Sequence, residues 1–234
     1  MSGHSKWATT KRHKAVVDAK RGAIFTKIGN QIAIAARAGT DPETNAALAM
    51  ILEKARQANM PKANVDRAVA RAADKSAADL IEETYEAYGP GGVGIIVEIA
   101  TDNKNRTLPE VRHTLEKNGG RMADPGSVMF QFARKGVIFT SAKGDEIMMA
   151  ALDGGAEDVV EEDDGTTIYT AGGDLAKVRS ALLAGGFEIS SAELQYVPNN
   201  MVPVEGDNLA KVEKILDAID DLDDVTAVHT NAEM

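Results

Sequence analysis

The sequence predicts an α+β protein: an N-terminal three-helix domain plus two ferredoxin-like β-α-β-β-α-β domains, one inserted in the other. Apolar residues recur with helical spacing up to about residue 78, and short apolar runs then alternate with helical segments. The segments within 134–197 make one complete β-α-β-β-α-β set. The segments on either side of it supply the two halves of a second set, which predicts an insertion.

The first domain, residues 1–78, is expected to be helical. Apolar residues at Ile24, Ile28 and Ile32 predict a first helix, which ends near Gly39. Residues 1–21 are expected to leave this helix as a flexible tail, because the glycine that follows them is poorly suited to a helix interior.

Proline and aspartate mark the next two helices. Asp41 is expected to cap the second helix, with Pro42 at its first position. Pro61 is expected to open the third, with Val65 and Val69 facing inward.

The rest of the chain alternates between strand and helix patterns. The expected strands are 93–101, 127–132, 136–140, 157–161, 167–170, 187–196, 201–204 and 225–230. The expected helices are 106–117, 145–152, 175–183 and 208–219. Asp163-Asp164-Gly165 is typical of a hairpin turn. The expected domains are a discontinuous one, 79–133 plus 198–234, and an inserted one, 134–197.

Charge is distributed unevenly along the chain. The formal net charge is −10, yet residues 1–75 contain 14 Lys and Arg against 6 Asp and Glu, a net charge of +8. The remaining residues therefore carry −18. Because phosphate responds to local charge, this asymmetry favours a basic element that contacts a polyanion. An uneven solvated surface is the alternative.

Several function classes are not supported by the sequence. There is no cysteine, the four histidines lack metal-ligand spacing, and no apolar run approaches the roughly 20 residues that cross a bilayer. The glycine motif at 89–94 precedes a strand, whereas a dinucleotide-binding motif follows one. The acidic runs 161–164 and 220–224 lack the spacing of a calcium loop and are expected to be solvated. We therefore expect a cytoplasmic protein that is not an enzyme, with no cofactor, no metal, no membrane contact and no small-molecule substrate.

Basic residues near the N-terminus are the first candidate contacts to nucleic acid. Lysine and arginine neutralise phosphate, and an exposed tryptophan can stack on an unpaired base. Packing of Trp7 onto the helices is the alternative. The candidates are His4, Lys6, Trp7, Lys11, Arg12, His13, Lys14, Lys20, Arg21 and Lys27. A second set, for which a solvated helix face is an equal alternative, comprises Lys104, Arg106 and Arg112.

Six short motifs resemble those of the YebC/PmpR family, which includes the mitochondrial translational activator of cytochrome c oxidase. They are Gly3-His4-Ser5-Lys6-Trp7, Asp18-Ala19-Lys20-Arg21-Gly22, Ala58-Asn59-Met60-Pro61, the run 85–92, the run 101–107 and Lys117-Asn118-Gly119-Gly120. Ala123-Asp124-Pro125 departs from the family's usual sequence. The resemblance covers essentially the whole chain and implies a three-domain α/β protein without catalytic residues.

The resemblance also implies two possible functions. Bacterial members are generally described as DNA-binding transcriptional regulators, and other members are linked to translation and the ribosome. No helix-turn-helix with base-reading Asn, Gln or Arg side chains on one face is evident in residues 62–73, which counts against direct reading of DNA sequence. We expect a nucleic-acid-binding regulator of gene expression, with DNA as the first partner and rRNA or mRNA on the ribosome as the alternative.

Overall fold

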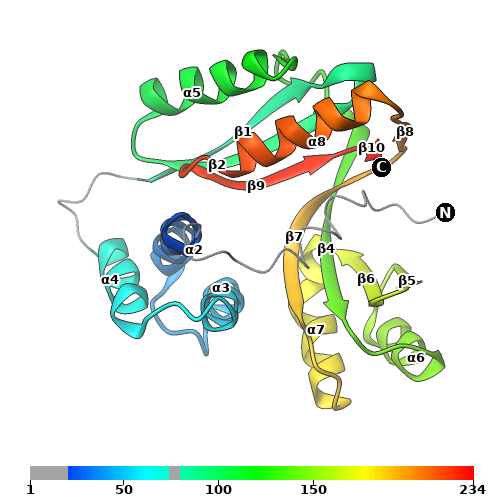
Figure 1. Ribbon diagram of the computed structural model, residues 1–234. Helices are drawn as coiled ribbons and strands as arrows, with labels where there is room; N and C mark the ends of the chain where they lie inside the picture. Colours follow the sequence, from blue (N-terminus) through cyan, green and yellow to red (C-terminus); the bar gives the residue numbers. More distant parts are fainter. Residues whose placement is uncertain (1–20, 74–79) are drawn as a thin grey trace. The chain divides into compact units, whose positions relative to one another are not determined.

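The computed structural model describes residues 21–73 and 80–234. It confirms the α+β class: three α-helices within 21–73 precede two four-stranded antiparallel sheets with their helices (Figure 1). The described residues divide into two compact units. One comprises those up to Phe132 together with Pro198–Met234, and the other is Ala133–Val197.

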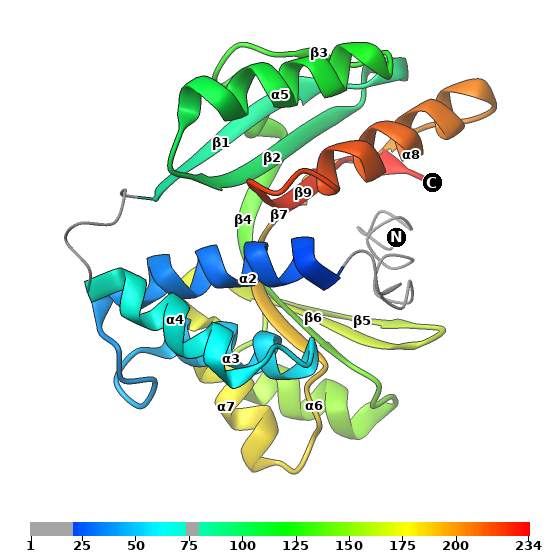
Figure 2. The same ribbon diagram turned by 60° about the vertical axis from the view of Figure 1, so that its left-hand side comes forward.

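The three N-terminal helices are α2 (Arg21–Ala35), α3 (Ala46–Gln57) and α4 (Lys62–Ala73). Figure 2 shows α2 lengthwise with α3 and α4 beside it. The predicted apolar stripe is confirmed, because Ile28 and Ile32 are buried against Leu48, Ala55 and Ala68. A short 3-10 turn, η2 (Ala36–Ala38), ends α2.

Two expectations about these helix ends are wrong. The described part of the first helix includes Arg21 and Gly22, so Arg21 is not part of a tail. The second helix is capped by Asn45 and not by Asp41. The Asn45 side chain accepts the N–H of Leu48 and donates to the carbonyl of Ala35, so it starts one helix and ties down the end of the previous one.

The first sheet has the order β3-β1-β2-β9. Its strands are β1 (Ile81–Tyr88), β2 (Gly94–Thr101), β3 (Arg121–Met122) and β9 (Val225–Thr230). Helices α5 (Lys104–Lys117) and α8 (Asp207–Asp220) cover one face, where their side chains and those of β2 form a buried apolar core. A short turn, η3 (Pro90–Gly92), leads into β2, as expected for the glycine motif.

The sheet differs from the expected one at three places. Strand β1 was not expected, because three of its eight residues are glutamates. The expected strand 127–132 is wrong: η4 (Met129–Gln131) is a 3-10 turn. The expected strand 201–204 shortens to β8 (Val202–Pro203), which pairs with β10 (Ala232–Glu233) in a separate two-stranded sheet. Two strands that were not expected, β1 and β3, therefore complete the main sheet in place of 127–132 and 201–204.

The unit Ala133–Val197 contains the second sheet, in the order β5-β6-β4-β7. Its strands are β4 (Phe132–Thr140), β5 (Asp158–Glu162), β6 (Gly165–Ala171) and β7 (Ser191–Pro198). Its helices are α6 (Asp145–Gly154) and α7 (Leu175–Ala184), with a 3-10 turn, η5 (Gly172–Asp174), before α7. The predicted hairpin joins β5 to β6, and a Cβ at Gly165 would lie 2.2 Å from the Thr140 carbonyl oxygen. Strand β7 begins at Ser191, four residues later than expected.

Of the helices in 21–73 and 80–234, none combines the length and the hydropathy that a membrane span requires.

Candidate nucleic-acid interface

A groove runs between α2 and α4, with a volume of about 790 Å³. Among the residues that the structure describes, its lining contains two arginines and no carboxylate, although Arg71 at one end also pairs with Asp102 and the whole chain carries a net charge of −10. The lining residues are Gly22, Phe25, Thr26, Gly29, Asn30, Met60, Asn64, Arg67, Ala68, Ala70 and Arg71. Cationic and amide side chains without competing acids are what a phosphate backbone or a base edge requires.

Small residues allow the two helices to form this groove. Gly29 of α2 faces Met60 and Ala68, and a Cβ placed on it would make ordinary van der Waals contacts of 3.8 and 4.0 Å with their side-chain carbons. A glycine or an alanine at this position of α2 therefore fits against Met60 and Ala68. Asn64, Arg67 and Arg71 follow one another at helical spacing on α4, so all three reach the groove.

The structure thus places Asn64, Arg67 and Arg71 of the segment 62–73 along one groove, which the sequence pattern did not reveal. Asparagine and arginine are the side chains that most often read adenine and guanine in the major groove of DNA. The spacing i, i+3, i+7 was visible in the sequence. Only the packing of α4 against α2 shows that these side chains face one groove.

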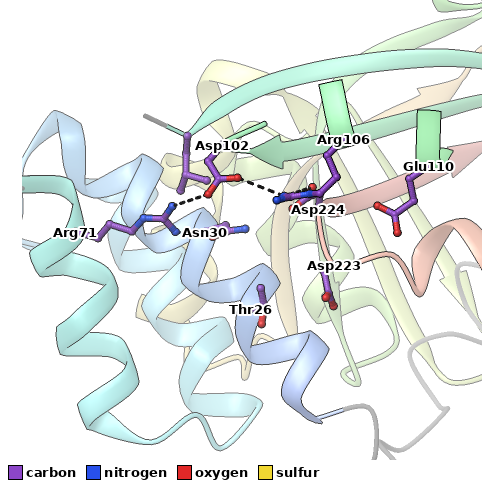
Figure 3. Close-up of a pocket in the computed structure, with 9 residues that line it drawn as sticks. Thr26, Asn30, Arg71, Asp102, Arg106, Glu110, Asp223 and Asp224 are labelled. Atoms are coloured by element: carbon purple, nitrogen blue, oxygen red, sulfur yellow. Dashed lines mark hydrogen bonds and ion pairs between the residues drawn. The ribbon is translucent and has the colours of Figure 1, made fainter. Parts of the chain in front are cut away.

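Arg71 marks the end of this groove, because it also lines an adjoining pocket of about 450 Å³ (Figure 3). Its guanidinium donates to the side-chain oxygen of Asn30 at 3.2 Å and lies 3.7 Å from the carboxylate of Asp102. Asn30 is buried and donates to the Ala100 carbonyl at 3.3 Å, so it fixes α2 to strand β2. Helix α4, helix α2 and the sheet are thus joined by one hydrogen-bonded side-chain pair.

The adjoining pocket is acidic. Arg71 and Arg106 are its cations, whereas Asp102, Glu110, Asp223 and Asp224 supply four carboxylates. Figure 3 shows the guanidinium of Arg106 between Asp102 and Asp224. A net negative lining repels phosphate, so we assign the candidate interface to the groove and not to this pocket.

Asp224 is the centre of the pocket's hydrogen-bond network. Its Oδ2 accepts from Arg106 at 2.7 Å, from Thr107 at 2.6 Å and from Thr101 at 3.0 Å. Burial by itself would raise the pKa of Asp224, but these three donors outweigh burial and hold the pKa below its usual value. The hydrogen bond to Asp224 raises the pKa of Arg106 in turn. This part of the acidic run 220–224 is therefore structural, whereas it was expected to be solvated.

The other predicted site residues are separated by the fold. Lys27 donates to the Asp220 carbonyl and forms an ion pair with its carboxylate, Lys104 forms an ion pair with Glu83, and Arg112 is exposed on α5. Lys104, Arg106 and Arg112 share a helix, but acids already pair with the first two. Arg21 begins α2. The residues that lie outside the described parts of the chain are His4, Lys6, Trp7, Lys11, Arg12, His13, Lys14 and Lys20.

Metal binding has no basis in the described residues. Within 21–73 and 80–234, no three His, Asp or Glu side chains are arranged so that they could hold an ion.

Comparisons with known proteins cover nearly the whole chain. Residues 5–75 match the model of the TACO1/YebC protein N-terminal domain, and residues 80–232 match that of the TACO1/YebC second and third domain. A probable transcriptional regulatory protein of Pelotomaculum thermopropionicum is 44% identical, with 100% of this chain and 99% of the relative covered. One of Mycolicibacterium gilvum is 48% identical, with 100% and 96% covered.

A solved structure has the same fold. The crystal structure of the conserved hypothetical protein Aq1575 from Aquifex aeolicus superposes with a TM-score of 0.88 at 38% identity, covering 94% of this chain and 93% of that one. Two family models that together span residues 5–75 and 80–232, and relatives of similar length, lead to one conclusion: the chain belongs to the TACO1/YebC family.

Proposed function

We propose that this protein is a cytoplasmic, non-enzymatic regulator of gene expression that binds DNA through the groove between α2 and α4. The observation that carries the proposal is the composition of this groove, in which the described lining residues include Arg67, Arg71 and Asn64 but no carboxylate. The groove belongs to the part of the chain, residues 1–75, whose net charge is +8. The two full-length relatives described above are named probable transcriptional regulatory proteins, which supports the same function.

The chemistry of the groove accommodates both parts of DNA recognition. Arginine contributes phosphate neutralisation, and Asn64 and Arg67 are of the types that make two hydrogen bonds to a base edge. The acidic remainder of the chain, with a net charge of −18 over residues 76–234, repels DNA elsewhere. Binding is therefore expected to be confined to the basic helices and the basic residues that precede them in sequence.

Arg67→Ala tests the proposal. We expect weaker binding of duplex DNA and a salt dependence, d log K/d log[salt], that is shallower by about 0.9, the value for one phosphate contact. Arg56→Ala is the matched control, because Arg56 is an exposed arginine of α3 that lies outside the groove and pairs only with nearby Glu53. The two variants are compared by fluorescence anisotropy across a salt series. Equal affinity and slope for Arg67→Ala and wild type would contradict the proposal.

Binding of RNA on the ribosome is the second candidate function. It is favoured by the tryptophan at position 7, which stands among seven basic residues within residues 1–27. Single-stranded and looped RNA offers unpaired bases on which an indole ring can stack, whereas the bases of duplex DNA are already stacked.

We also infer that each sheet with its helices is a ferredoxin-like domain, with boundaries at 79–133 plus 198–234 and at 134–197. The order β4-α6-β5-β6-α7-β7 supports this for the second. For the first, the order of elements differs from the expected one because β1 precedes β2, yet two helices still cover one face of a four-stranded sheet. In such domains rigid strands and turns hold side chains in fixed positions, so these side chains can contact nucleic acid with little loss of conformational freedom.

A further inference from the structure

Phe130 is the most exposed of the large apolar side chains in the described residues. It lies in η4, and its exposed fraction is 73%, against 64% for Met149 and 53% for Leu152. Singly exposed apolar side chains are common on protein surfaces, so exposure alone does not imply a partner, but this ring is available for a contact outside the folded chain.

The turn that carries Phe130 is held rigidly by Glu86 of β1. The buried carboxylate of Glu86 accepts the backbone N–H groups of Gly126 at 2.5 Å, Val128 at 2.6 Å and Met129 at 2.8 Å. Val128 is fully buried, and its side chain lies so close to Gly94 that a Cβ there would be only 2.8 Å away. The residues just before Phe130 are therefore fixed by both hydrogen bonds and packing.

The other side of the turn is fixed as well. Asn199 donates its side-chain amide to the Phe130 carbonyl at 3.3 Å and its backbone N–H to the Gln131 carbonyl at 2.8 Å. The side chain of Gln131 in turn accepts from Asn231 at 2.8 Å. Phe130 thus projects from a turn that has little backbone freedom left to lose when a partner binds.

The segments next to Phe130 favour the binding of nucleic acid, because they contain no acidic residue that would repel phosphate. Neither of the two segments that meet at the turn, 125–132 and 198–204, contains an aspartate or a glutamate, although the chain has 36 of them. Asn199 and Asn200 are exposed, and Asn199 donates to the Phe130 carbonyl. Asp124 and Glu205 lie just outside the two segments, and the carboxylate of Glu86 is buried beneath the turn. An exposed, flat aromatic ring is the kind of side chain on which unpaired bases stack.

We propose that Phe130 is a stacking platform for an unpaired nucleobase of single-stranded DNA or RNA, separate from the groove between α2 and α4. The inference rests on the proposed function, because it adds a second contact for the same class of partner. It also extends that function, since a protein that holds one base unstacked binds opened or looped strands in preference to intact duplex.

The test compares full-length variants on single-stranded DNA, single-stranded RNA and duplex DNA of the same sequence, by fluorescence anisotropy. We expect Phe130→Ala to weaken single-strand binding about 5- to 150-fold and to leave duplex binding unchanged. Phe130→Trp should bind as wild type, and Phe130→Leu should bind like Phe130→Ala, because leucine is apolar but does not stack. The DNA and RNA arms show which strand supplies the base. Met149→Ala, which removes another exposed apolar side chain, is the control and should have no effect.

Each contrary result has its own meaning. If wild type binds single strands and Phe130→Ala binds them equally well, the stacking proposal fails while the proposed function stands. If Phe130→Leu binds single strands as tightly as wild type, a simple apolar contact explains the binding and the stacking proposal is overturned. Crosslinking in cells from position 130 to protein alone would assign the ring to a protein partner instead. If wild type binds no nucleic acid at all, the proposed function fails and this inference fails with it.

Discussion

The carboxylate of Glu86 accepts the backbone N–H of Val128 at 2.6 Å and so ties strand β1 to a turn 42 residues further along the chain. The exposed fraction of Glu86 is only 7%, and each carboxylate oxygen has at least one backbone donor. A buried charge is tolerated when hydrogen bonds replace its lost hydration, and here three N–H groups do so.

This relationship predicts a pH dependence of stability. Burial alone would raise the pKa of Glu86, but the three backbone donors outweigh burial and lower the pKa from the usual 4.5. A lowered pKa in the folded state means that the carboxylate stabilises the fold at pH values above its unfolded pKa, and that this stabilisation is lost as the pH falls through the folded value. Glu86→Gln should therefore be less stable at neutral pH and should show a shallower loss of stability below about pH 4.5.

Urea denaturation at a series of pH values measures this effect. Glu82→Gln is a suitable control, since Glu82 is an exposed residue of the same strand for which the structure shows no set of backbone N–H donors like that of Glu86. The hypothesis is wrong if Glu86→Gln and wild type lose stability in parallel between pH 5 and pH 3.

The same residues show why part of the fold was not predictable from the sequence. The stripe of Ile28 and Ile32 and the apolar run of β2 follow local periodicity, and both were predicted correctly. Residues 127–132 contain an equally strand-like apolar run, but Val128 and Met129 give their N–H groups to Glu86 and not to a neighbouring strand. That choice depends on a residue 42 positions before Val128, which no local pattern can reveal.

The candidate interface was predicted in part for a similar reason. The concentration of basic residues before residue 75 is a property of composition, so it was found. The pairing of Arg106 with Asp224 joins residues 118 positions apart, and the sequence gives no sign that this arginine is already engaged. Conversely, Asn64 and Arg67 were visible in the sequence, but their direction depends on how α4 packs against α2.

Asp224→Ala should destabilise the fold. The variant removes the acceptor shared by Arg106, Thr107 and Thr101, and both threonines are fully buried or nearly so. Loss of a hydrogen-bonded charge beside buried donors costs roughly 1–3 kcal/mol of unfolding free energy. Asp223→Ala is the matched control, because Asp223 belongs to the same acidic run but is exposed, and its effect should stay within about 0.5 kcal/mol. Equal urea midpoints for the two variants would show that the network contributes nothing.

The inserted domain should fold on its own. The fragment 134–197 retains every residue of the β4–β6 and β5–β6 pairings and should unfold cooperatively in urea. The fragment 79–133 should not, because the neighbour of β2 on one side is β9 and because Val212, Ile215 and Ile219 of α8 complete its core. A well-dispersed NMR spectrum of 79–133 alone would refute the discontinuous domain.

The last prediction separates DNA binding from RNA binding through two kinds of contact near the N-terminus. Lys11→Ala combined with Arg12→Ala removes charge, so the salt dependence of affinity should become shallower by about one to two units on either polymer. Trp7→Ala removes a ring and no charge, so the slope should stay nearly unchanged. If Trp7 stacks on bases, its loss should weaken looped RNA by roughly 1–3 kcal/mol and duplex DNA hardly at all, because duplex bases are already stacked. Both variants are measured on a matched RNA hairpin and DNA duplex across one salt series.

A Trp7 effect confined to RNA favours the translational function. A small and equal effect on both, together with one duplex sequence bound far more tightly than the others, supports the regulator of transcription, since discrimination among duplexes requires base edges to be read by side chains such as Asn64 and Arg67.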